Sequence, residues 1–126
     1  MIRILLFHME EGRAQKAFLA VKDMGAAVLS VDESREKAPI ALLAGERLPG
    51  PFGIGEELPP AVPFTEEMMV ICGADHDTLM RMLKKLERAG FGGVLKAVMT
   101  PDNSFWNALQ LYGVLSDERA AMHPQG

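Results

Sequence analysis

The chain has 126 residues, of which 48% are hydrophobic and 24% are charged, and its formal net charge is −4. A chain of this length is expected to form a single domain, residues 1–126, that buries roughly two-thirds of the surface exposed by the unfolded chain. The acidic balance provides no basic cluster to neutralise phosphates, which argues against nucleic acid and against an anionic membrane surface as partners.

The N-terminal apolar run, residues 2–7, turns polar at His8. It is too short for a signal peptide or a transmembrane span, and the single cysteine excludes an internal disulfide. These features predict a cytoplasmic protein. Because the run is short and nearly unbroken, it also predicts a central strand that is covered on both faces.

A helix and a second strand are expected next. From Gly12 to about Met24 apolar residues recur every three or four positions, which predicts an amphipathic helix that ends at Gly25. The apolar residues 26–31 then predict a strand.

The middle of the chain differs in composition from the segments on either side. The segment between Pro39 and Gly45 predicts a short helix, with the proline in its first turn and the glycine as its stop. Between Gly45 and Pro63 the chain carries four glycines and five prolines, which leave little room for regular hydrogen bonding. We therefore expect residues 45–63 to form an internal loop.

The second half repeats the first. Residues 67–73 predict a third strand, and a helix with leucines and a methionine on one face follows and stops at Gly90. Residues 93–100 predict a fourth strand, and a final helix is expected from about Asp102 to the neighbourhood of Met122. Both halves therefore have the order strand, helix, glycine, strand.

Two folds accommodate such a doubled βαβ unit. If the middle segment, residues 35–45, is a crossover helix, the strands form a mainly parallel sheet of order 2-1-3-4 with helices on both faces. If that segment is only a loop, an α+β ferredoxin-like βαββαβ fold results. We favour the three-layer α/β fold, because continuous apolar strands require cover on both faces. This fold predicts that the first and third strands are parallel neighbours, with His8 and His76 at one sheet edge within ~12 Å.

The most distinctive stretch is LKAVMTPDNSFW, from Leu95 to Trp106. It resembles the signature Leu-Lys-Ala-Val-x-Thr-Pro-x-Asn-x-x-Trp of an uncharacterised family of small bacterial proteins, catalogued as a domain of unknown function. The resemblance extends across residues 67–123, and Asp102 departs from the small neutral residue expected at its position. It implies no activity. The individual positions that match are Lys96, Thr100, Pro101, Asn103 and Trp106.

These residues allow a structural and a functional interpretation. Thr100 before Pro101 must be extended, so it can cap the following helix while Asn103 reaches back to it. The same free N–H groups could instead attract an anion, although Asp102 would repel one. Lys96 fits an exposed edge strand, or a pairing with a carboxylate beside a small-molecule site. Trp106 fits the core better than a stacking platform.

Further polar residues follow the ends of the predicted strands. His8 comes directly after the first strand and His76 follows the third. In the parallel model they gather beside Thr100, at the edge where α/β proteins bind ligands. No spacing is that of a known metal site, so no metal is expected, and Cys72 inside a buried strand is expected to be inert. The candidate ligand-binding residues are Lys96, Thr100, Asn103, His76 and His8.

Three functions are consistent with these residues. The first is a non-enzymatic binding or regulatory module that acts through protein contacts, with a homo-oligomer or another protein as partner. The second is a small-ligand, in particular an anion, binding domain at the strand-end edge. The third is a small enzyme that uses the cluster His8, Glu11, Asp75 and His76. No cofactor is expected, and the sequence leaves open whether the chain is an enzyme.

Overall fold

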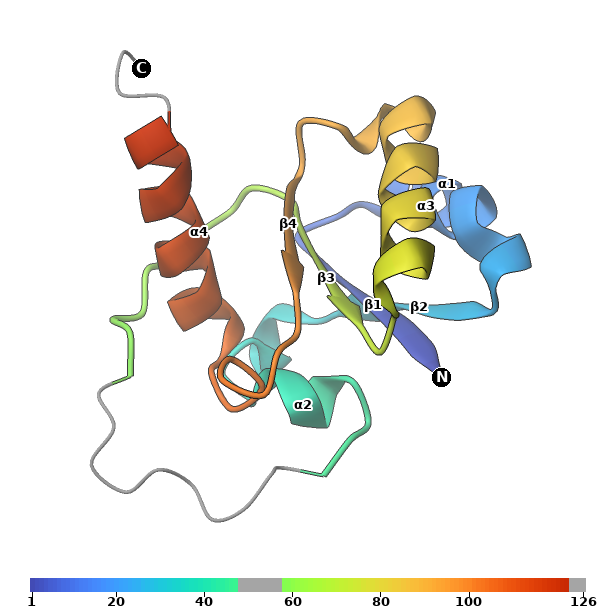
Figure 1. Cartoon of the computed structure of the whole chain (residues 1–126). Helices are drawn as coiled ribbons and strands as arrows, with labels where there is room; N and C mark the ends of the chain where they lie inside the picture. Colours follow the sequence, from blue (N-terminus) through green and yellow to red (C-terminus); the bar gives the residue numbers. More distant parts are fainter. Residues whose placement is uncertain (48–57, 123–126) are drawn as a thin grey trace.

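The computed structural model of the chain describes residues 1–47 and 58–122. A four-stranded sheet of order β2-β1-β3-β4 forms its centre (Figure 1), and this order is the predicted one. β1 and β3 lie in the middle, where four of the six residues of β1 and all five of β3 are buried. The strands are β1 (Ile2–Phe7), β2 (Ala26–Val31), β3 (Met68–Cys72) and β4 (Leu95–Val98).

Helices cover both faces of the sheet, so the predicted three-layer α/β arrangement is confirmed. Side chains of β1 alternate between two cores, as the pleat requires. Leu5 and Phe7 enter the core under α2 and α4, whereas Ile4 and Leu6 enter the core under α1 and α3. The helices are α1 (Glu11–Val21), α2 (Ile40–Leu43), α3 (His76–Leu86) and α4 (Ala108–Met122), with short helical turns η1 (Lys22–Met24), η2 (Glu33–Arg35) and η3 (Glu87–Phe91). None of the helices within the described ranges is long and apolar enough to cross a membrane.

The direction of the third strand differs from the prediction. β1 pairs with β2, and β3 with β4, in parallel, but β1 and β3 are antiparallel. The connection from β2 to β3 explains this, because it runs along the sheet twice. Gly45 lies against the Arg3 side chain near the start of β1, whereas Phe64 lies against His8 at the end of β1. The chain therefore runs through α2 toward the start of β1, and it returns to the end of β1 before β3 begins.

The antiparallel centre separates residues that the parallel model had placed together. Each βαβ unit has its own carboxyl edge, and the two edges lie at opposite ends of the sheet. His8 follows β1 at one edge, whereas His76 and Thr100 follow β3 and β4 at the other. The predicted common edge for His8 and His76 is therefore wrong, and the site that combined them does not exist.

The two βαβ units are related by an approximate two-fold axis through the β1–β3 pair. Leu5 and Val70 lie opposite each other, and the register runs symmetrically to both sides of this pair. Corresponding residues share backbone conformations: Gly25 and Gly90, which follow the two helices, have φ angles of 72° and 98°. The predicted repetition of a strand–helix–strand unit is thus present, with the second copy turned by half a turn about an axis perpendicular to the sheet.

The corner after β4 is built as a capping structure, but α4 begins later than expected. Thr100 N donates to Asn103 Oδ1 at 2.8 Å, and Asn103 N donates to Thr100 Oγ1 at 3.2 Å. This reciprocal pair is the predicted capping arrangement, yet residues 101–105 form turns and α4 starts at Ala108. A second reciprocal pair, with both bonds at 2.9 Å, joins Asn107 and Gln110 at the true helix start.

The loop between β4 and α4 also completes the start of α2. Ile40 N donates to Trp106 O at 2.9 Å and Ala41 N donates to Ser104 O at 2.7 Å, which satisfies two N–H groups of the first turn of α2. The Trp106 side chain is partly buried and packs against the core with Leu109, as expected of a core residue. The signature stretch is therefore a structural junction between α2, β4 and α4.

Candidate functional site

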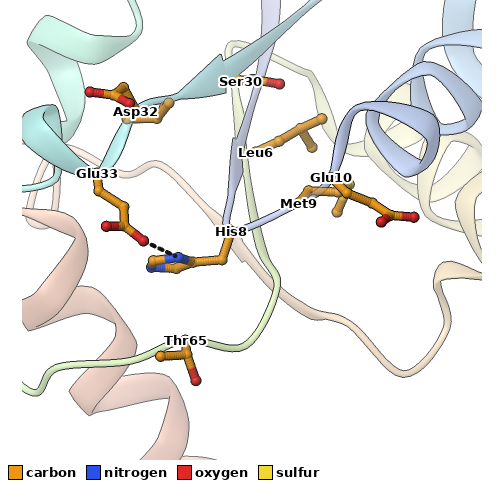
Figure 2. Close-up of a pocket in the computed structure, with 9 residues that line it drawn as sticks. Leu6, His8, Met9, Glu10, Ser30, Asp32, Glu33 and Thr65 are labelled. Atoms are coloured by element: carbon orange, nitrogen blue, oxygen red, sulfur yellow. Dashed lines mark ion pairs between the residues drawn. The ribbon is translucent and has the colours of Figure 1, made fainter.

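A cleft of about 550 Å³ lies at the carboxyl ends of β1 and β2, the position where α/β sheets commonly bind ligands. The β1–α1 connection forms one wall and the β2–η2 connection forms the other (Figure 2). Its lining mixes apolar and polar side chains: Leu6, His8, Met9, Glu10, Ser30, Val31, Asp32, Glu33 and Thr65.

His8, in the lining of this cleft, has an unusual backbone conformation. Its φ angle of 56° is left-handed, and it is the only residue other than glycine with a positive φ in the part of the chain that the structure describes. The corresponding residue of the second unit is Gly73, with a φ of 83°. Left-handed conformation costs an L-residue with a Cβ about 1 kcal/mol, so the first unit accepts a strain that the second avoids.

The His8 side chain is 90% buried and is held between two carboxylates. Its Nδ1 lies 3.5 Å from Glu33 Oε1, and its Nε2 lies 2.5 Å from Glu36 Oε1. Glu36 is itself largely buried, whereas the Glu33 side chain is 81% exposed. His8 therefore connects the end of β1 to the turn that follows β2.

Aromatic rings continue this connection toward α4. The ring of Phe64 meets His8 edge-on, with centroids 4.7 Å apart, and stacks on Tyr112 at 4.4 Å. Tyr112 Oη donates to Glu66 Oε1 at 2.6 Å, and Arg119 donates to both oxygens of Glu66 at 2.7 and 3.0 Å. Hydrogen bonds from Arg119 and Tyr112 lower the pKa of Glu66 to about 2. These contacts hold residues 64–66 between the cleft and α4.

The starts of α1 and α3 differ in a way that affects the cleft. Asp75 caps α3, because its side chain accepts a hydrogen bond of 2.8 Å from Thr78 N. Glu10 occupies the same position before α1, but its side chain makes no capping hydrogen bond. Figure 2 shows the Glu10 side chain extending away from His8. Its carboxylate is exposed to solvent on that side of the cleft and interacts electrostatically with Arg13.

Asp32 and Glu33 supply the carboxylates of the opposite wall. Asp32 begins η2 and accepts hydrogen bonds from the backbone N–H and the hydroxyl of Ser34, which lower its pKa. Glu33 contacts His8 (Figure 2). With Glu10 these residues place three carboxylates in the lining of the cleft, and His8 is the only lining residue that can carry a positive charge.

Of the five predicted site residues, only His8 lines this cleft. Thr100 borders a separate hollow of about 340 Å³ at the opposite sheet edge, beside Arg47 and Ser104. His76 is exposed at the start of α3, and Asn103 is occupied by its reciprocal bonds with Thr100 and by a bond of 3.1 Å to Val98 O. Sequence reasoning missed the role of Glu36, for which the sequence offers no motif.

Lys96 lies on the edge strand β4, as predicted, but its ammonium group does not project freely into solvent. It donates to the carbonyl of Val94 at 3.0 Å and to the carbonyl of Phe91, both of which precede the strand. Burial lowers the pKa of Lys96. Its contacts therefore stabilise the end of η3 rather than the corner at Thr100.

The remaining candidate chemistry is limited in the described ranges 1–47 and 58–122. Cys72 is buried in β3, and burial raises the pKa of its thiol to about 12. Within those ranges no group of three or more His, Cys, Asp or Glu side chains is placed to hold a metal ion. The cleft at His8 is thus distinguished by its shape, its hydrogen-bond acceptors and its strained histidine.

The fold and the clefts define a three-layer α/β protein built from two βαβ units. Residues 67–122 match the model of a family described as "Domain of unknown function (DUF3783)". This region contains β3, α3, β4 and α4, including the signature stretch, whereas the residues that line the cleft at His8 all precede it. No curated protein and no solved structure matches the chain.

Proposed function

We propose that the chain is a cytoplasmic, non-enzymatic domain that binds a small molecule in the cleft at the carboxyl ends of β1 and β2. The observation that supports this most directly is the left-handed His8. The second unit makes the corresponding turn with Gly73, so the turn itself does not require a histidine side chain. Strained residues are retained mainly where a site needs the side chain in one place.

The lining indicates the kind of ligand. Carboxylates of Glu10 and Glu33 and the hydroxyl groups of Ser30 and Thr65 present mostly hydrogen-bond acceptors. A ligand that donates hydrogen bonds and carries a positive charge, such as a small amine, complements this surface, whereas an anion would be repelled. The apolar lining residues can pack against a hydrocarbon part of the same molecule.

Binding is favoured over catalysis by the contacts of His8. Each ring nitrogen faces a carboxylate of the chain, at 3.5 and 2.5 Å, in the positions from which the imidazole would exchange a proton with a substrate. The cleft then acts by recognition of its ligand, with His8 holding the two walls together through Glu33 and Glu36.

The proposal can be tested by amide NMR spectroscopy with agmatine and tyramine as amine probes, and acetate and phosphate as acidic controls. We expect the amines to shift the resonances of Met9 and Asp32 in a saturable manner. Glu33→Gln should weaken this binding about tenfold, since one charge-assisted hydrogen bond is worth about 1.5 kcal/mol. Glu118→Gln, an equally conservative change on the exposed side of α4, should leave it unchanged.

Two results would overturn the proposal. One is the absence of any saturable shift with either amine. The other is a set of shifts, produced by the acidic probes, around Thr100 and Ser104, which would move the site to the hollow at the opposite edge.

A second function, contact with other proteins, is favoured by exposed apolar residues near the internal loop. The side chains of Leu58 and Val62 are 50% and 38% exposed. Phe52 and Ile54, which are expected to contribute to the same surface, lie outside the described residues. Deletion of residues 51–57 should weaken partner binding while the fold is retained, and unchanged binding would count against this function.

A further inference from the structure

We propose that two copies of this chain associate through their β2 strands, which pair antiparallel across a two-fold axis to form one eight-stranded sheet. β2 is an edge strand, and among the described residues no strand pairs with its outer side. Its sequence, AAVLSV, contains neither a charged residue nor proline. Such an edge presents a row of backbone donors and acceptors to any matching strand.

The other edge strand, β4, is protected against pairing with a further strand in ways that β2 is not. β4 has four residues instead of six and carries Lys96. Pro101, which has no backbone N–H group, follows shortly after it. The sheet therefore has one edge strand that can accept a further strand, β2 (the open edge), and one that disfavours pairing, β4 (the closed edge). A pairing between β2 of one copy and β4 of the next would meet the closed edge, whereas a pairing between two β2 strands uses only open edges.

Charges at the two ends of β2 favour the antiparallel direction. Before the strand lie Lys22 and the ion pair between Lys85 and Asp23, whose charged atoms are 3.4 Å apart, so this end is net positive. After the strand, residues 32–37 include three acidic side chains, Asp32, Glu33 and Glu36, and two basic ones, Arg35 and Lys37, so this end is net negative. In an antiparallel pair each positive end meets a negative end of the partner, and in a parallel pair like charges would meet. Antiparallel pairing of identical strands has two-fold symmetry and stops at two copies.

The register of the pair is set by Leu29. Leu29 lies opposite Leu5 in the β1–β2 ladder, so its side chain is on the sheet face that carries α2 and α4. This side chain is 38% exposed in the single chain. A two-fold axis perpendicular to the sheet keeps each face on its own side, so Leu29 can lie opposite Leu29 of the second copy. The two leucines then cover each other.

Light scattering coupled to size-exclusion chromatography tests the proposal on the full chain. We expect the wild-type mass to approach twice 13.8 kDa as its concentration rises through the micromolar range. Leu29→Lys, which places two ammonium groups at the two-fold axis, should return the mass to that of one chain. Leu42→Lys is the matched control, because Leu42 is 46% exposed but belongs to α2 and not to the edge strand. It should associate like the wild type.

Cross-linking provides a second measurement that does not depend on a charged substitution. Residues opposite each other in an antiparallel pair have Cα atoms within disulfide reach, so Leu29→Cys should form a disulfide-linked dimer under oxidising conditions and Leu42→Cys should not. The native Cys72 is buried and does not interfere. A wild-type mass of one chain at all concentrations would overturn the proposal, as would equal association of both lysine variants or failure of Leu29→Cys to cross-link.

Discussion

Substitution of Gly113 by alanine should destabilise the protein, although it replaces a helix-breaking residue inside α4. In a solvent-exposed helix this change stabilises by about 1 kcal/mol, because alanine loses less backbone entropy. Here the new methyl group would lie 2.9 Å from Val62 Cγ2 and 3.1 Å from the carbonyl oxygen of Pro60. Overpacking of this kind costs about 1–3 kcal/mol. The net loss expected for Gly113→Ala is therefore about 1 kcal/mol.

Urea denaturation of three variants measures this difference. Gly12→Ala in α1 is the control, since an added methyl group there meets no atom within 4 Å, and it should raise the free energy of unfolding. Gly113→Ala should lower it, and combining Gly113→Ala with Val62→Ala should recover part of the loss, because the shorter side chain removes the closer contact. If Gly113→Ala stabilises as much as Gly12→Ala, residues 60–62 do not press against α4 and the close packing described above is wrong.

Other residues lead to equally direct measurements. Because hydrogen bonds lower the pKa of Glu66 from 4.5 to about 2, its contribution to stability is complete above pH 4.5 and is lost as the pH falls toward 2; Glu66→Gln should flatten the acid limb of stability plotted against pH, and an unchanged limb would contradict this. Asn107→Ala should cost about 1 kcal/mol in urea denaturation by removing the cap of α4, and a loss below 0.3 kcal/mol or so would show that this cap is dispensable. With a thiol pKa raised to about 12 by burial, Cys72 should react with iodoacetamide only after denaturation, and rapid alkylation of the native protein at pH 8 would show that β3 opens readily.

The sequence carried enough information to predict the layers and the order of the strands. The continuous apolar runs of β1 and β3 required cover on both faces, and the repeated strand–helix–strand pattern placed these two strands in the centre. The direction of β3 was not predictable in the same way. The direction of β3 is set by the number of times that the segment between β2 and β3 runs along the sheet. No local residue pattern indicates that number.

Local signals were most informative where they involved neighbouring residues. The reciprocal bonds of Thr100 and Asn103 were readable from their spacing, and the same spacing at Asn107 and Gln110 could have located the start of α4. Pro101 favoured the earlier start, because proline is common in the first turn of a helix. In contrast, the left-handed backbone of His8 and its contact with Glu36 depend on how distant segments meet, so the sequence alone gave no sign of them.

The antiparallel pairing of β1 and β3 gives the molecule two ends of the same kind that face in opposite directions. The cleft beside His8 and the hollow beside Thr100 are separated by the length of the central strands, roughly 20 Å at about 3.3 Å per residue. An occupant of one therefore cannot touch an occupant of the other. Influence between them can pass along the central pair of strands, or through α4, which contacts His8 by way of Tyr112 and Phe64. Because the central pair is antiparallel and two-fold related, a shift of β1 along β3 would move both carboxyl ends outward together or inward together.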